Sequence, residues 1–77
     1  MGPYRFTVEL YPDPEEGGYT AIVPSLPGCV SQGDTLDQTL ERAREAIAGY
    51  LECLQADGKA IPVEEEPEGR FKVIIAA

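Results

Sequence analysis

The fold is decided by residues 33–58, which read GDTLDQTLERAREAIAGYLECLQADG. Thr35 followed by Gln38 has the spacing of a capping box, and Asp34 is a rival N-cap. Apolar residues then recur in steps of three and four, as on one face of a helix: Leu36, Leu40, Ala43, Ile47, Tyr50, Leu51 and Leu54. Gly58 is a suitable C-terminal stop. The stretch therefore predicts one amphipathic helix whose apolar stripe packs against a sheet.

Four other segments have the composition of β-strands, and they fall at residues 4–11, 19–23, 29–32 and 70–75. The first two are joined by Pro12-Asp13-Pro14-Glu15-Glu16-Gly17-Gly18, which predicts a hairpin turn. Pro24 to Gly28 separates the second strand from the third, because two prolines exclude a central strand. An acidic loop, Pro62 to Gly69, follows the helix.

The order of elements predicts an α+β fold, β-β-β-α-β, in which one four-stranded sheet is covered on one face by the single helix. We expect the last strand to lie beside the first, and residues 1–77 to form one domain. The other face of the sheet would carry Thr7, Thr20, Ile22 and Ile74. Together with the small size of the chain, these apolar members predict a homodimer or a tetramer, and an exposed mixed face is the alternative.

Composition excludes several classes of function. The 77 residues include 14 Asp and Glu against six Lys and Arg, a formal net charge of −8. This charge argues against direct nucleic-acid binding and against an anionic membrane surface, and it favours a basic protein partner or simply aids solubility. The first residues lack the apolar stretch of a signal peptide, so we expect a cytoplasmic protein.

Catalytic and metal-binding chemistry has little support in the residue types present. The chain has no histidine, which removes Ser-His-Asp, Cys-His and His-containing metal sites. Cys29 and Cys53 form no Cys-x-x-Cys pair, so two free thiols are expected, with one disulfide as the alternative. A carboxylate-dependent Mg²⁺ hydrolase would draw on Glu9, Asp34, Asp37, Glu41 and Glu45, but no spacing selects a trio. We expect no metal, no cofactor and no enzymatic activity.

Four short motifs together resemble the HicB-like antitoxin family. They are Gly17-Gly18-Tyr19, Pro24-Ser25-Leu26-Pro27-Gly28-Cys29, Gly33-Asp34-Thr35-Leu36 and Ala43-Arg44-Glu45-Ala46, and the pattern covers about residues 17–50. Gln38 and Thr39 depart from it, since the family often carries acids there.

The resemblance implies a partial, degenerate ribonuclease-H-like fold with a mixed sheet, in which the last strand runs parallel to the first. It also implies loss of the nuclease carboxylates and binding of a HicA toxin, a small basic ribonuclease that cuts messenger RNA. An orphan oligomeric scaffold without a toxin is the remaining alternative. Family members usually carry a further C-terminal DNA-binding domain; because the sequence ends at Ala77, we do not expect that activity from it.

Two proline-stiffened loops are the predicted contact surface for such a partner. Asp13, Glu15 and Glu16 would face the basic toxin and accelerate the encounter. Tyr19 and Leu26 would serve as apolar anchors. The acidic loop at 64–68 is the next candidate.

Overall fold

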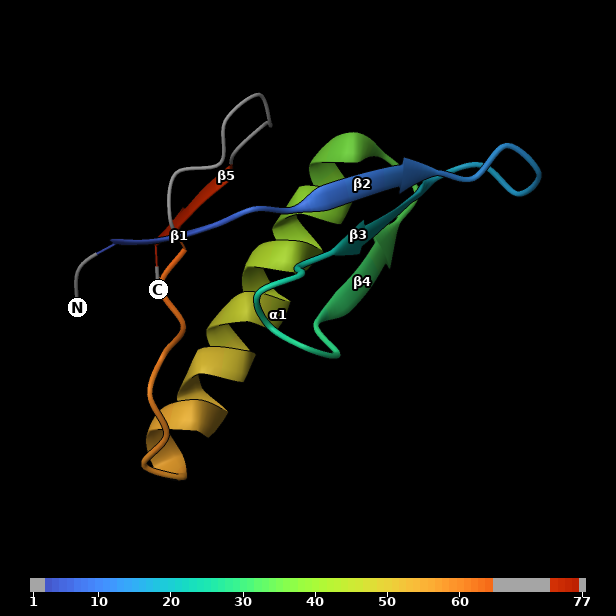
Figure 1. The fold of residues 1–77 in the computed structure, drawn as a ribbon. Helices are drawn as coiled ribbons and strands as arrows, with labels where there is room; N and C mark the ends of the chain where they lie inside the picture. Colours follow the sequence, from blue (N-terminus) through green and yellow to red (C-terminus); the bar gives the residue numbers. More distant parts are fainter. Residues whose placement is uncertain (1–2, 65–72, 77) are drawn as a thin grey trace.

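The α+β class predicted from the sequence is confirmed. The structure, a computed structural model, describes residues 3–64 and 73–76 of the chain. Its elements are β1 (Pro3–Phe6), β2 (Glu9–Pro12), β3 (Tyr19–Ile22), β4 (Val30–Gly33), α1 (Leu36–Ala56) and β5 (Val73–Ala76) (Figure 1). Strands β2, β3 and β4 form an antiparallel sheet in that order, and α1 crosses one face of it.

Helix α1 begins and ends where the sequence predicts. The Thr35 Oγ1 atom accepts a hydrogen bond from the Gln38 N–H at 3.0 Å, and Gln38 Oε1 accepts one from the Asp34 N–H at 2.6 Å. Both contacts satisfy donors near the N-terminus of the helix. At the other end the Gly58 N–H donates to the Gln55 carbonyl, and Gly58 adopts a φ of +69° that favours glycine.

The buried stripe of the helix is displaced from the predicted one at its N-terminal end. Thr39, Ala43, Ile47 and Leu51 are buried, whereas Leu36 is exposed. Gly33 explains why Thr39 is buried in place of Leu36. The glycine has no side chain, so the backbone of β4 packs directly against Thr39; a Cβ atom at Gly33 would lie 2.6 Å from the Thr39 backbone nitrogen. The first turns of the helix therefore approach the end of β4 closely at Thr39.

The core lies between the helix and the inner face of the sheet and continues beneath the β3–β4 loop. Its buried apolar residues are Phe6, Val8, Ala21, Val23, Leu26, Cys29, Ala43, Ile47 and Leu51.

The first predicted strand is divided in two, and this corrects the predicted sheet. Strand β2 pairs with β3, but β1 pairs with β5 in a separate antiparallel ribbon, with Tyr4 opposite Ile75. Among the described strands there is thus no single mixed four-stranded sheet, and β5 runs antiparallel to β1 instead of parallel to it. The relationship to ribonuclease-H-like folds stays a prediction.

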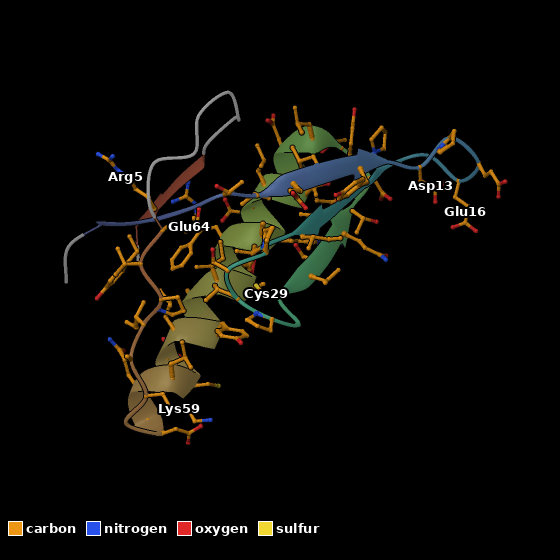
Figure 2. The ribbon with its side chains drawn as sticks, in the orientation of Figure 1. Arg5, Asp13, Glu16, Cys29, Lys59 and Glu64 are labelled. Carbon is orange, nitrogen blue, oxygen red and sulfur yellow. The ribbon has the colours of Figure 1, made fainter. Side chains whose placement is uncertain are left out.

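Glu64 supplies the physical reason for the division. Its carboxylate accepts hydrogen bonds from the Thr7 N–H at 2.9 and 3.1 Å and from the Thr7 hydroxyl at 2.7 Å. It also accepts one from the Ser25 hydroxyl at 2.7 Å. Figure 2 labels Glu64 in the segment that follows the helix. The Thr7 N–H is therefore used by a side chain instead of a strand partner. Thr7, predicted on the open face of the sheet, is buried.

Replacing Gly33 with alanine tests the close approach of β4 to the helix. We expect Gly33→Ala to lower the free energy of unfolding by about 1–3 kcal/mol, because the new Cβ forces the helix and strand apart. Gly49→Ala is the matched control: a Cβ there meets nothing within 4 Å, so it should raise helix stability by about 0.5–1 kcal/mol. Urea denaturation at low protein concentration measures both. Equal effects of the two substitutions would contradict the packing described.

Candidate partner-binding surface

The β2–β3 turn is an ordered acidic tip. The Asp13 N–H donates to the Gly18 carbonyl at 3.0 Å, and the Gly17 N–H donates to the Asp13 carbonyl at 2.9 Å. Asp13 Oδ1 also accepts hydrogen bonds from the Glu15 and Glu16 amides at 2.9 and 3.2 Å. Figure 2 shows Asp13 and Glu16 at the far end of the hairpin. The turn is thus held in shape by one of its own carboxylates.

A polar hollow of about 220 Å³ lies at the base of this turn. Asp13, Glu16 and Tyr19 line it from the hairpin, and Asp34 and Arg42 line it from the β4–α1 side. Three carboxylates against one guanidinium make the hollow acidic. The Arg42 Nη1 atom donates to the Gln32 carbonyl at 3.1 Å, which ties that cation to the end of β4.

The structure brings four of the five predicted contact residues together. Asp13, Glu15 and Glu16 are exposed at the tip, with Tyr19 half-buried beside them. Asp34 and Arg42 were not predicted at this surface, although the hairpin register places Gly33, the neighbour of Asp34, opposite Tyr19.

Leu26 is not part of this surface. It has no exposed area and lies in the core. The Leu26 N–H donates to the Val23 carbonyl and the Leu26 carbonyl accepts from the Cys29 N–H, so a tight turn holds the side chain inward. Its loop also joins the opposite end of β3 from the acidic turn, so the two predicted loops do not form one patch (Figure 1).

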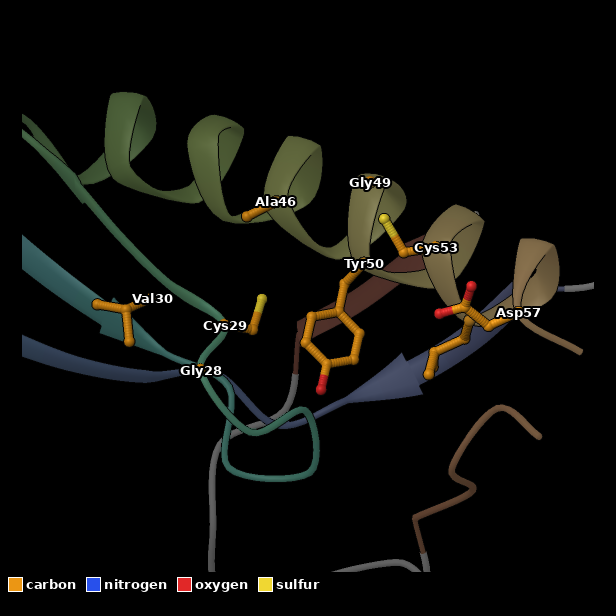
Figure 3. A pocket seen from close by; sticks show the side chains of 9 residues that line it. Gly28, Cys29, Val30, Ala46, Gly49, Tyr50, Cys53 and Asp57 are labelled. Atoms are coloured by element: carbon orange, nitrogen blue, oxygen red, sulfur yellow. The ribbon is translucent and has the colours of Figure 1, made fainter. Parts of the chain in front are cut away.

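A second concave feature is a groove of about 440 Å³ between the start of β4 and the second half of α1. Figure 3 shows its walls. On the strand side they are Gly28, Cys29 and Val30, and on the helix they are Ala46, Gly49, Tyr50, Cys53, Leu54 and Asp57. Both cysteines are free, Cys29 buried and Cys53 exposed. Burial raises the pKa of the Cys29 thiol above its ordinary value of 9.0.

The described residues offer no metal site. No group of three His, Cys, Asp or Glu side chains within 3–64 and 73–76 is placed to hold an ion. Of the predicted hydrolase acids, Glu9 accepts a hydrogen bond from the Tyr11 hydroxyl at 3.0 Å, while Asp37, Glu41 and Glu45 lie on the exposed face of α1. Within the same residues, no helix has the length and apolarity needed to cross a membrane.

Comparison with known proteins shows which family the chain belongs to. Residues 4–71 match the family model described as HicB-like antitoxin of bacterial toxin-antitoxin system. The chain belongs to the HicB-like antitoxin family. This confirms the resemblance carried by the four sequence motifs. Family membership supports an antitoxin role in a toxin–antitoxin system and implies a toxin partner.

Individual proteins of known sequence or structure are also similar to this HicB-like chain. It is 42% identical over 62 residues to the UPF0150 protein ssr1765 of Synechocystis sp., covering 80% of this chain and 77% of that protein. It is 39% identical over 59 residues to Antitoxin HicB 1 of Photorhabdus laumondii, covering 77% of this chain but 37% of that protein. The N-terminal domain of Burkholderia pseudomallei antitoxin HicB has the same fold, with a TM-score of 0.76, 24% identity and coverage of 95% and 96% of the two chains.

Because Leu26 is buried, truncating its side chain should lower the stability of the fold. We expect Leu26→Ala to lower the free energy of unfolding by about 2–5 kcal/mol, because it empties a fully buried site. Val63→Ala, at a side chain 86% exposed, should change it by less than about 0.5 kcal/mol. Urea titration of the two variants makes the comparison, and a neutral Leu26→Ala would show that the loop is not packed as described.

Burial of Cys29 predicts a pH dependence of stability. Its pKa is higher in the folded than in the unfolded chain, so the unfolded state loses the proton first as pH rises. The stabilisation is therefore complete below about pH 9 and lost as pH climbs through the folded-state value. We expect the alkaline fall in unfolding free energy to be shallower in Cys29→Ala than in the unsubstituted chain. Cys53→Ala, at an exposed thiol, should keep the full fall.

Proposed function

We propose that this HicB-like domain, residues 1–77, neutralises a small basic ribonuclease of the HicA type by binding it as a protein partner in the cytoplasm. The proposal assigns the domain no catalytic step. Support comes from the family, whose members are antitoxins, and from the net charge of −8, which suits a cationic partner.

The acidic turn carries the proposal. Because Asp13 Oδ1 already holds the Glu15 and Glu16 amides, little conformational entropy is lost when a partner docks on the tip. Glu15 and Glu16 are exposed and close in sequence, so their fields add at the end of the hairpin. A cationic surface would be drawn to this end of the molecule.

The hollow below the turn would take a lysine or arginine side chain of the partner. Asp13, Glu16 and Asp34 supply carboxylates, and Tyr19 supplies an aromatic wall. A guanidinium can pair with carboxylates and stack on an aromatic ring in the same site, which an ammonium does less well. Leu26 would join such an interface only by leaving the core, so the proposed surface consists of Asp13, Glu15, Glu16 and Tyr19.

Charge reversal at the tip tests the proposal. With a catalytically inactive HicA-type toxin from the same genome as ligand, Glu15→Lys/Glu16→Lys should slow association about tenfold at low ionic strength and flatten its salt dependence. The matched control is Glu45→Lys/Glu52→Lys, which changes the net charge equally at exposed positions on α1. Stopped-flow or surface-based kinetics at several salt concentrations gives both rates.

The control variant should bind with nearly the original rate constant. If both double variants slow association equally, net charge alone attracts the toxin and the turn is not its docking surface. If the unsubstituted chain neither binds the toxin nor relieves growth arrest by it, the proposed function is wrong.

A further inference from the structure

The sheet β2–β3–β4 has one open face. Helix α1 packs on the other face, and within the described residues no helix or strand packs on this one (Figure 1). Ala21 of β3 has no exposed area and lies in the core, so Thr20 and Ile22 beside it point to the open face. The register of the strands adds the residues opposite these two. The open face thus consists of Glu9, Tyr11, Thr20, Ile22, Val30 and Gln32.

The centre of the open face is apolar. Tyr11 is 50% exposed and Val30 is 52% exposed. Ile22 lies opposite Val30 on the central strand and is half-buried without belonging to the core. The Tyr11 hydroxyl donates to Glu9 Oε1 at 3.0 Å, which restrains the ring on this face. An aromatic side chain restrained in this way loses little conformational entropy when a partner covers it.

The open face is continuous with the acidic turn. Strand β2 leads into the turn and β3 leads out of it (Figure 1). Thr20 and Gln32 of the open face line the hollow at the base of the turn, together with Asp13 and Glu16. Tyr11 pairs with Thr20 in the register, so the apolar part of the face begins beside the hollow. A protein that docks on the turn therefore meets this face as the adjoining surface.

A partner needs more surface than the turn offers. Specific interfaces bury roughly 800 Å² on each partner, which exceeds what a single turn can supply. We propose that a small cationic protein, attracted by the acidic turn, is held on the open face of the sheet. Its apolar contacts there are Tyr11, Ile22 and Val30, and its basic side chains lie toward the turn and the hollow. The proposal rests on the proposed function and adds the surface that keeps the partner bound.

Charge favours a cationic protein over a second copy on this face. The chain has a net charge of −8, and the exposed acids Asp13, Glu15 and Glu16 lie in the turn at one end of the face. A second copy would bring another net charge of −8 to the same surface, and the two would repel each other. A cationic protein with an apolar patch and a basic rim is complementary in both respects.

The dissociation rate of the inactive HicA-type toxin tests the assignment. Tyr11→Thr and Ile22→Thr keep residues that favour strands but remove apolar surface. Each should speed dissociation, Tyr11→Thr about tenfold, and leave the association rate constant within about twofold of the original. Val63→Thr makes the same kind of change at a side chain 86% exposed outside this face, and it should alter neither rate. Gly49→Gln, which fills the groove between β4 and α1, should alter neither rate as well.

Four results would overturn the proposal. If the unsubstituted chain binds but neither Tyr11→Thr nor Ile22→Thr speeds dissociation, the partner is held elsewhere and the proposed function stands. If Gly49→Gln speeds dissociation instead, the groove holds the partner. If sedimentation shows a free oligomer that Tyr11→Thr and Ile22→Thr dissociate, a second copy covers the face. If the unsubstituted chain does not bind the toxin, this inference falls together with the proposed function.

Cross-saturation from unlabelled toxin to the methyl-labelled chain gives a readout without substitutions. The methyl signals of Ile22 and Val30 should lose intensity, whereas those of Val63, outside the face, should not. Ile47 has no exposed area beneath the helix and serves as the control for spin diffusion. Loss of intensity at Leu54, which lines the groove, without loss at Ile22 would contradict the assignment.

Discussion

The approach of strand β4 to the first turns of helix α1 at Gly33 is the constraint on which the rest of the structure depends. No side chain separates the strand from Thr39, whose hydroxyl donates to the Thr35 carbonyl at 2.7 Å and is thereby satisfied although fully buried. With the helix start fixed there, its 3.6-residue period carries Ala43, Ile47 and Leu51 over the inner face of the sheet. One helix can then cover three short strands.

The other half of the molecule is organised by a carboxylate. Glu64 accepts hydrogen bonds from Thr7 and Ser25, so it joins the end of β1, the β3–β4 loop and the segment that follows the helix. A partly buried carboxylate is costly without partners, and these donors offset that cost. Removing the Thr7 N–H from strand pairing ends the first ribbon there, and the chain continues into β2 with a new partner.

Local signals in the sequence were enough to predict the helix, its Thr35–Gln38 cap and the hairpin, because each depends on residues a few positions apart. The break between β1 and β2 at Thr7 was not predictable in this way, because the partner of Thr7, Glu64, is 57 residues away in the sequence. From the sequence alone, Glu64 cannot be distinguished from the other glutamates of the acidic loop. Leu26 was misplaced for a related reason. Its flanking prolines indicate a loop, but only the packed core shows that the loop turns its leucine inward. The structure places Asp13, Glu15, Glu16 and Tyr19 together, and Asp34 and Arg42 line the same hollow from the β4–α1 side. That this surface binds a partner stays a prediction.

Charge is distributed unequally over the molecule, because the acidic turn and the apolar groove lie in different places. Strand β3 separates the acidic turn at one of its ends from the Leu26 loop and the adjoining groove at the other (Figure 1). Exposed carboxylates act mainly on the rate of encounter, whereas desolvated apolar contacts act mainly on the lifetime of a complex. A cationic partner attracted to the turn would thus leave the apolar groove between β4 and α1 uncovered.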